Sequence, residues 1–336
     1  MICFTAFTRR GVALALRARD ALGEGQVWTL PKFRQEGVEC YESLSDWTEE
    51  RFAQNDDLIF VGAAGIAVRS IAPCVRDKWS DPAVLSMDEQ GNYVIPLLSG
   101  HAGGANRLAR RLSRLIGAVP VISTATDLHQ LFAVDEWAVR SGIPVADPAA
   151  AKAISAALLE GEKLGFFSEL SHGPLPEGFE ERPFAPDLAL TCRAAERFPE
   201  RTLVLHPRLL TVGLGCKAGT STDALEEAVS SVLREHGLAR ESVATLASID
   251  LKRGEAGLLA LSERWGVPLS FYSAEALSDL PGVFTASDFV RSVTGVDNVC
   301  ERSAVLSAGN GALMVLKTRF PGITVAVARR DCFFEF

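Results

Sequence analysis

The segment SGHAGGAN, residues 99–106, places a histidine and an asparagine among glycines where an apolar strand gives way to an amphipathic helix. We call this segment the glycine corner. Glycines allow a ligand or another backbone to approach closely, and a helix start offers N–H groups with a partial positive charge. The corner therefore predicts an anion-binding site, although a tight strand-to-helix turn alone would also account for its glycines. The residues expected to bind there are Ser99, Gly100, Gly103, Gly104 and Asn106.

His101 is the residue of this corner that could do chemistry. The ordinary pKa of histidine lies near neutrality, so an imidazole in such a place is a candidate general acid or base. The spacing equally allows a histidine that caps or packs. A metal-ligand role is disfavoured, because no second histidine or cysteine stands at ligand spacing.

A second group of polar residues follows another predicted strand end, in GAAGIAVRSIAPCVRDKWSDPAVLSMDEQG, residues 62–91. Charges of both signs beside a glycine-rich turn suit a substrate that carries carboxylates. Any one of these charges, taken singly, is ordinarily part of a surface ion pair. The candidate residues are Gly62, Gly65, Arg69, Lys78 and Asp81.

The third glycine-rich strand end is VGLGCKAGTSTDALEEAV, residues 212–229. A predicted parallel strand ends in glycines and a helix follows, so backbone N–H groups again stand at the carboxyl end of a strand. The segment lacks the GK[ST] ending of a P-loop and misses the dinucleotide fingerprint by one residue, which disfavours a nucleotide-dependent enzyme. Cys216 is interpreted as a buried, unreactive thiol, because no histidine is near it in sequence. The candidate binding residues are Gly215, Lys217, Thr220 and Ser221.

The order of apolar patterns predicts an α/β fold: two α/β domains with mainly parallel sheets that flank a smaller, less regular middle segment. Residues 1–130 alternate apolar strands with amphipathic helices, and the alternation returns over 207–336. Residues 131–206 begin with two helical patterns and then lose periodicity among prolines and glycines. We therefore expect an N-terminal domain with the glycine corner, a middle or linker segment, and a C-terminal domain with the GLGCKAGTS motif.

The composition is that of a globular protein, with 48% hydrophobic and 23% charged residues among 336. The net charge of −8 argues against a nucleic-acid partner, because affinity for phosphate backbones comes mainly from clustered Lys and Arg. Seven scattered cysteines without paired spacing predict a reduced, cytoplasmic environment. Arginines interrupt the apolar N-terminus and no stretch reaches about 20 consecutive apolar residues, so we expect neither a signal peptide nor a membrane partner.

These motifs, in this order, resemble a known family. GAAGIAVRSIAP, DKWSDPAV, LSGHAGGAN and ISTATD are similar to the N-terminal part of the CbiG family of cobalamin-biosynthesis proteins, and VGLGCKAGTS, GVDNVCERSAVL and TVAVARR to its C-terminal domain. The resemblance covers nearly the whole chain and adds Thr124 and Glu301 to the expected substrate-binding residues. Two departures stand out: Arg302 and Ser303 follow Glu301 where the family has small apolar residues, and residues 131–206 match only loosely.

The resemblance implies a hydrolase that opens the δ-lactone of cobalt-precorrin 5A and releases acetaldehyde, giving cobalt-precorrin 5B. The substrate is a cobalt-containing tetrapyrrole that brings its own metal, so the resemblance implies no cofactor and no metal held by the protein. Its acetate and propionate groups suit helix N-termini and scattered Arg and Lys. Neighbouring enzymes of the pathway remain open as partners.

Within this resemblance, His101 is the expected base that activates water, with Asp81 as the second candidate. Lys78 or Arg69 would stabilise the oxyanion that forms. We expect residues of the C-terminal domain to face the same substrate across an interdomain cleft. The alternative function is a non-catalytic tetrapyrrole carrier. A carrier would bind its ligand without changing the ligand's mass, and a variant at His101 would then lose affinity rather than turnover.

Overall fold

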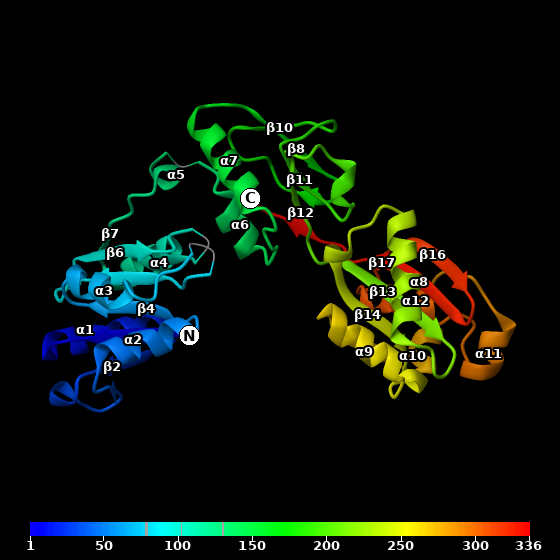
Figure 1. Ribbon diagram of the computed structural model, residues 1–336, viewed down its shortest axis with the longest axis horizontal. Coiled ribbons are helices and arrows are strands. Elements are labelled where there is room, and N and C mark those ends of the chain that lie inside the picture. The colour runs from blue at the N-terminus through cyan, green and yellow to red at the C-terminus, as the bar shows by residue number, and fades with distance from the viewer. Residues whose placement is uncertain (78–79, 102, 130) are drawn as a thin grey trace. The chain divides into compact units, whose positions relative to one another are not determined.

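In the computed structural model the chain forms two compact units, Met1–Val139 and Arg140–Phe336, which we call the N-terminal and C-terminal units. The structure describes residues 1–77, 80–101, 103–129 and 131–336. The C-terminal unit holds three further sheets among the described residues: a four-stranded sheet in the middle of the chain, a five-stranded sheet near its end (Figure 1), and a two-stranded sheet that pairs residues 171–172 with 333–334. The predicted boundaries at residues 130 and 206 stay a prediction. No helix among the described residues is long and apolar enough to cross a membrane.

A seven-stranded sheet forms the N-terminal unit, in the order β3-β2-β1-β4-β5-β6-β7. Neighbouring strands run parallel except β5 and β6, which are antiparallel. This confirms the prediction of an α/β fold with a mainly parallel sheet. The strands are β1 (Ile2–Ala6), β2 (Gln26–Thr29), β3 (Glu39–Cys40), β4 (Asp57–Val61), β5 (Val84–Met87), β6 (Tyr93–Leu98) and β7 (Val119–Pro120).

Helices cover both faces of this sheet because its central strands are apolar on both sides. Phe4 and Ile59 pack with the helices α1 and α4 on one face, while Leu58 and Phe60 pack with α2 and α3 on the other. Successive side chains of a strand point to opposite faces, so a continuous apolar run indicates a strand that is buried on both. The helices are α1 (Arg9–Leu22), α2 (Leu44–Ala53), α3 (Ala64–Ile71), α4 (Ala105–Ile116), α5 (Ala125–Leu128) and α6 (Val134–Arg140).

The middle of the chain forms a four-stranded parallel sheet in the order β10-β8-β11-β12. Its strands are only three to five residues long, which is why the sequence pattern weakens there. The end of the chain returns to this region, because β18 pairs in parallel with β9. The elements are α7 (Pro148–Leu159), β8 (Leu164–Ser168), β9 (Ser171–His172), β10 (Phe179–Glu181), β11 (Leu188–Leu190), β12 (Leu203–Leu205) and β18 (Phe333–Phe334).

The last sheet has five strands in the order β15-β14-β13-β17-β16, of which β13, β14 and β15 are parallel and β17 is antiparallel to both its neighbours. The helix α12 packs closely on β13: a β-carbon at Gly213 would lie 1.8 Å from the carbonyl oxygen of Cys300, so only glycine fits there. The elements are β13 (Leu210–Cys216), α8 (Thr222–Glu235), β14 (Val243–Ile249), α9 (Ala256–Trp265), β15 (Leu269–Tyr272), α10 (Ala274–Ser278), α11 (Asp288–Thr294), α12 (Cys300–Ser307), β16 (Ala312–Phe320) and β17 (Ile323–Arg329).

Candidate active site

The glycine corner leads from β6 into α4, and the backbone at Ser99 and Gly104 has a positive φ that favours glycine. Ser99 has a φ of 56°, which is uncommon for a residue with a side chain, and Gly104 has a φ of 81°. A β-carbon at Gly103 would lie 2.3 Å from the β-carbon of Ser99, so glycine is required there as well. Among the described residues the buried Ser99 hydroxyl has no hydrogen-bond partner. Strained backbone conformations persist only where the surrounding structure holds them, and they are found most often at functional sites. The backbone of Ser99 therefore supports a functional role for this corner.

The N–H groups at the start of α4 are bonded within the corner itself. The amides of Gly104, Ala105 and Asn106 each donate to a carbonyl of the preceding loop, over 2.9, 3.1 and 2.9 Å respectively. The predicted anion site depended on these groups being free. For these three amides the glycines serve the tight turn instead, because the loop folds back far enough for its own carbonyls to reach the helix start.

Asn106 is buried, with 1% of its surface exposed. Its Nδ2 donates to Oγ1 of Thr124 at 2.9 Å and to Oδ2 of Asp127 at 2.6 Å. A β-carbon at Gly100 would lie 3.0 Å from this amide group, so the glycine leaves room for it. Both Asn106 and Thr124 were expected to bind substrate, but the bond between them ties α4 to the segment that leads into α5.

His101 lies between two carboxylates. Its Nε2 is 3.1 Å from Oδ2 of Asp127, and its Nδ1 is 3.8 Å from Oδ1 of Asp135. The histidine side chain is 17% exposed, so a ligand can reach the ring. A carboxylate partner orients an imidazole and attracts the positive charge that the ring gains when it accepts a proton. The arrangement can therefore serve a general base.

Asp127 connects the polar groups of this corner. Besides the bonds from His101 and Asn106, it accepts a close charge-assisted bond from Arg110. Burial alone would raise the pKa of Asp127, but the hydrogen bonds and charges of Arg110 and His101 outweigh it and lower that pKa below its ordinary value. Asp127 thus stays ionised across the physiological range and provides a fixed negative charge beside the histidine.

Asp127, Asp135 and Arg110 were not among the predicted site residues. One available signal was the spacing of Asn106 and Arg110, which are four residues apart on α4 and therefore lie on one face of the helix. Another was the position of Asp127 as the last residue of the ISTATD motif. Neither signal shows that these side chains meet, because the hydrogen bond between His101 and Asp127 spans 26 residues of sequence.

His101, Asp127 and Glu136 form a group in the described part of the chain whose ligand atoms lie within 4.8 Å of one another, close enough to hold a metal ion. Histidine nitrogen and carboxylate oxygen are suitable ligands for several divalent metals. Arg110, however, already pairs with Asp127 and places a positive charge beside this group, which opposes binding of a dication. The geometry therefore suits a proton-transfer network better than a metal centre.

The residues predicted to bind substrate after β4 differ in their exposure and in their contacts. Lys78 lies outside the described residues. Arg69 is exposed on α3, and Gly65 lies in the first turn of that helix. Gly62 follows β4 with a φ of 156°, and a β-carbon there would lie 2.9 Å from the ring of Phe7. Gly62 is thus required by packing, and Arg69 is left as the described cation of this group.

Asp81 is buried, with 5% of its surface exposed, and it stabilises a turn. Its Oδ2 accepts hydrogen bonds from the amides of Arg76 at 2.9 Å and Asp77 at 3.0 Å. The backbone carbonyl of Asp81 would lie 3.1 Å from a β-carbon at Gly103, so this turn packs against the glycine corner. Because backbone amides hold its carboxylate, Asp81 is poorly suited to the predicted role of second candidate base.

The predicted binding residues after β13 have two different roles. Gly215 and Lys217 line a cavity of about 540 Å³, whose described lining residues do not include Thr220 and Ser221. The Thr220 hydroxyl donates to the Lys217 carbonyl at 2.7 Å, and Ser221 caps α8. In the same loop the amide of Gly219 donates to a carboxylate oxygen of Glu255 at 2.7 Å.

Cys216 also lines this cavity. Burial raises the pKa of its thiol, an effect that the positive charge of Lys252 only partly opposes. This agrees with the interpretation of Cys216 as an unreactive thiol, because the thiolate is the nucleophilic form.

Glu301 is fully buried on α12 and does not contact a ligand-accessible surface. Its carboxylate accepts hydrogen bonds from the amide and hydroxyl of Thr285, from Nδ2 of Asn298 and from the amide of Lys317, all between 2.7 and 2.8 Å. The predicted substrate contact is thus replaced by an internal one. Glu301 fixes the loop before α11 and the strand β16 to α12, and sequence could not show this because its partners come from three separate segments.

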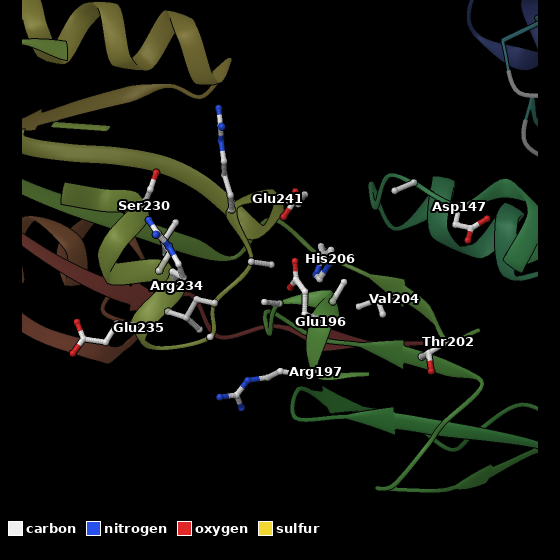
Figure 2. A pocket seen from close by; sticks show the side chains of 18 of the residues that line it. Asp147, Glu196, Arg197, Thr202, Val204, His206, Ser230, Arg234, Glu235 and Glu241 are labelled. Carbon is white, nitrogen blue, oxygen red and sulfur yellow. The ribbon is translucent and has the colours of Figure 1, made fainter. Parts of the chain in front are cut away.

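A second cavity, of about 960 Å³, lies elsewhere in the C-terminal unit, and Figure 2 shows its lining. Of the predicted site residues that the structure describes, none lines it. Its described lining carries more acidic than basic side chains, which disfavours a ligand rich in carboxylates. The charged lining residues are Asp147, Glu196, Glu200, Glu235 and Glu241, against Arg197, Arg234 and Arg240.

Two family models match this chain, one in its N-terminal part and one in its C-terminal part. The family model "Cobalamin synthesis G N-terminal" matches residues 46–127, and "Cobalamin synthesis G C-terminus" matches residues 210–328. A cobalt-precorrin-5A hydrolase from Salmonella typhimurium is 35% identical over 343 residues, covering 97% of each chain. The chain belongs to the CbiG family. This confirms the resemblance seen in the sequence motifs.

Other relatives match over similar lengths. A cobalt-precorrin-5A hydrolase from Priestia megaterium is 29% identical over 350 residues, covering 96% of this chain and 93% of that CbiG relative. The crystal structure of a cobalamin biosynthesis protein G homolog from Sulfolobus solfataricus is 21% identical, with a TM-score of 0.41 and coverage of 98% and 97%. The glycine corner and Asp127 fall within the match to the CbiG N-terminal model, and the 540 Å³ cavity lies within the C-terminal one.

Proposed function

We propose that this chain is a cobalt-precorrin-5A hydrolase that opens the δ-lactone of its substrate and releases acetaldehyde, giving cobalt-precorrin 5B in cobalamin biosynthesis. The observation that carries the proposal is the 35% identity to an enzyme of that name over 97% of both chains. The network around His101 supports it, since a hydrolase needs a group that activates water.

In the proposed first step, His101 accepts a proton from water while the water oxygen attacks the lactone carbonyl. The bond between the acyl carbon and the ring oxygen then breaks, and the imidazolium returns the proton to the leaving oxygen, so that a carboxyl group and a hydroxyl group result. Asp127 and Asp135 lie beside the ring that becomes positively charged. Their role is to orient the ring and to stabilise that charge.

In the second step, the hydroxyl on the extruded carbon loses its proton and becomes the carbonyl of acetaldehyde. The carbon–carbon bond to the macrocycle breaks, and the macrocycle accepts the electron pair. The same imidazole is free to take this proton after the lactone has opened. Arg69 is proposed to stabilise the oxyanion of the first step, and Lys78 remains proposed for the same role from outside the described residues.

We propose that the protein itself holds no metal or cofactor for this reaction, because the substrate carries cobalt. The arginine that pairs with Asp127 supports this, since its charge opposes a metal ion at His101, Asp127 and Glu136. Chelation of free metal ions should therefore leave turnover unchanged.

The test is anaerobic incubation of the purified chain with cobalt-precorrin 5A, with acetaldehyde trapped as a hydrazone while the corrinoid is followed by mass spectrometry. We expect acetaldehyde to form in step with the ring-opened product. Tight binding with an unchanged ligand mass would overturn the proposal and favour the alternative, a tetrapyrrole carrier. ATP and NAD serve as negative controls in a thermal-shift assay, because both nucleotide fingerprints are incomplete.

A further inference from the structure

We infer that the C-terminal unit carries its own binding site for the flat, carboxylate-rich tetrapyrrole, in the cavity of about 540 Å³ at the carboxyl ends of β13 and β14. The identity of the ligand rests on the proposed function. We call this site the cationic cavity, and its charged lining residues are Lys217, Lys252, Lys317 and Arg319.

Three parts of the last sheet and its connections form the cationic cavity. The ends of β13 and β14 contribute Gly215 and Ile249, and the hairpin of β16 and β17 contributes Lys317 and Arg319. The helix α11 closes the remaining side. The carboxyl ends of parallel strands are a common place for ligands in α/β sheets, since the loops that follow leave a crevice there.

The charge of the lining is of one sign. All four charged residues are cations, and no aspartate or glutamate lines the cavity among the described residues. Within the described part of the chain only Lys252 of these four is in an ion pair, with Glu255 at 3.0 Å. The side chain of Lys217 lies against the hairpin turn, because a β-carbon at Gly322 would come within 3.2 Å of its Cδ. Several cations with few acidic partners favour a ligand with several carboxylates.

The same cavity has an apolar wall. Phe289 and Val293 of α11 both line it and are 71% and 62% exposed. They are four residues apart and so lie on one face of the helix. Covering exposed apolar side chains with a flat ring system is favourable, because that surface is removed from water. Cations beside an apolar wall match a macrocycle whose ring is apolar and whose periphery carries acids.

The 960 Å³ cavity of the same unit provides the contrast. It is larger, but five acidic side chains line it beside three arginines. Burying the carboxylates of a tetrapyrrole next to those acids would be unfavourable. Charge, rather than volume, therefore selects the cationic cavity.

The test uses the full-length chain and uroporphyrin III, a flat tetrapyrrole with an acetate and a propionate on each pyrrole ring, in a fluorescence titration. The triple variant Lys217→Ala, Lys317→Ala and Arg319→Ala should raise the Kd at least about tenfold, because three favourable charges are removed. The matched control carries Lys152→Ala, Lys163→Ala and Arg330→Ala, which remove the same net charge from exposed positions of the same unit. The control should change the Kd by less than about twofold.

Phe289→Ala tests the apolar wall separately. Because Phe289 is exposed, we expect this substitution to leave the fold intact. It should weaken uroporphyrin III binding without affecting the circular dichroism spectrum. ATP should not displace the porphyrin, since its phosphates offer charge without a macrocycle. The inference is overturned if the triple variant binds like the parent, if the control loses as much affinity, or if ATP competes as well as the porphyrin.

Failure of this inference can be told apart from failure of the proposed function. If the parent releases acetaldehyde from cobalt-precorrin 5A and the triple variant keeps the parent's KM, the function stands and the cationic cavity is not the substrate site. If the parent binds uroporphyrin III through the cationic cavity but releases no acetaldehyde, the cavity stands and the hydrolase is rejected.

Discussion

The glycine corner gathers a histidine, two aspartates and an arginine within ion-pair distance, whereas the cationic cavity gathers lysines and an arginine beside apolar side chains. The corner has a candidate base, but three amides at the start of α4 are already bonded to carbonyls of the corner itself. The cavity has free volume and positive charge, but no histidine, aspartate or glutamate lines it among the described residues. Each region therefore offers what the other lacks.

This difference separates proton transfer from ligand binding. Residues that move protons are held rigidly by hydrogen bonds, because a base must be oriented before it acts. Residues that bind a large, charged macrocycle need open volume and charge, and these features favour affinity without providing a base. Variants in the corner should thus change kcat, and variants in the cavity should change KM or Kd.

The largest expected effect is at the proposed base. His101→Ala should lower kcat by about a hundredfold or more, because water would lose its proton acceptor, while the Kd for uroporphyrin III stays within about twofold. Acetaldehyde release and porphyrin fluorescence measure the two quantities. His236→Ala, an exposed histidine that ends α8, is the control and should behave like the parent. A His101 variant with lost affinity and normal turnover would reverse the comparison between the two regions.

The next effect concerns the residue that orients this base. Asp127→Asn should lower kcat by about tenfold or more, since the carboxylate no longer holds the ring or attracts its charge. The KM should change much less, because a positioning role affects the reacting state more than binding. Unchanged kcat with a normal pH profile would leave Asp127 a purely structural residue.

We also expect the difference in stability between the parent and Asp127→Asn to depend on pH. The folded pKa of Asp127 is lowered, so its contribution is present above the unfolded carboxyl pKa of about 4 and is lost as the pH falls through the folded value. The parent should therefore exceed Asp127→Asn in free energy of unfolding at pH 7, and the gap should narrow below about pH 4. Urea unfolding at both pH values measures it, with Asp46→Asn on the exposed surface of α2 as the control.

A smaller effect is expected from the buried carboxylate near the cationic cavity. Glu301→Gln should lower the free energy of unfolding by about 2 kcal/mol, because an amide N–H2 would face hydrogen-bond donors that now meet oxygen. Thermal unfolding of this variant beside the exposed Glu263→Gln measures it. A stable Glu301 variant that loses porphyrin affinity would instead support the substrate contact expected from the motif.

The smallest effect is that of salt. Raising ionic strength should raise the Kd for uroporphyrin III several-fold, since the cations of the cavity are partly exposed and their attraction is screened. At saturating substrate, kcat should change by less than about twofold, because the Asp127 carboxylate beside His101 is only 9% exposed and is therefore screened little by salt. A flat salt dependence of the Kd would show that apolar contact, not charge, provides the affinity.

Local patterns in the amino-acid sequence are enough to predict the α/β alternation, the strand ends at which glycines gather and the family, because periodicity, turn residues and long contiguous motifs are local properties. The same patterns predicted His101 and Lys217 as site residues. In the structure His101 lies beside Asp127, and Lys217 lines the cationic cavity. The sequence also predicted Glu301 as a substrate contact, where the structure shows a buried internal one.

Contacts between polar groups that are distant in sequence depend on how the chain folds. Asp127 reaches His101 across 26 residues because α4 and the segment before α5 pack together. Lys252 and Arg319 line one cavity because the strand order β14-β13-β17-β16 brings together segments that are far apart in sequence. Strand order, long-range packing and burial are set by the whole core, so no local pattern encodes which charges lie side by side and which are buried.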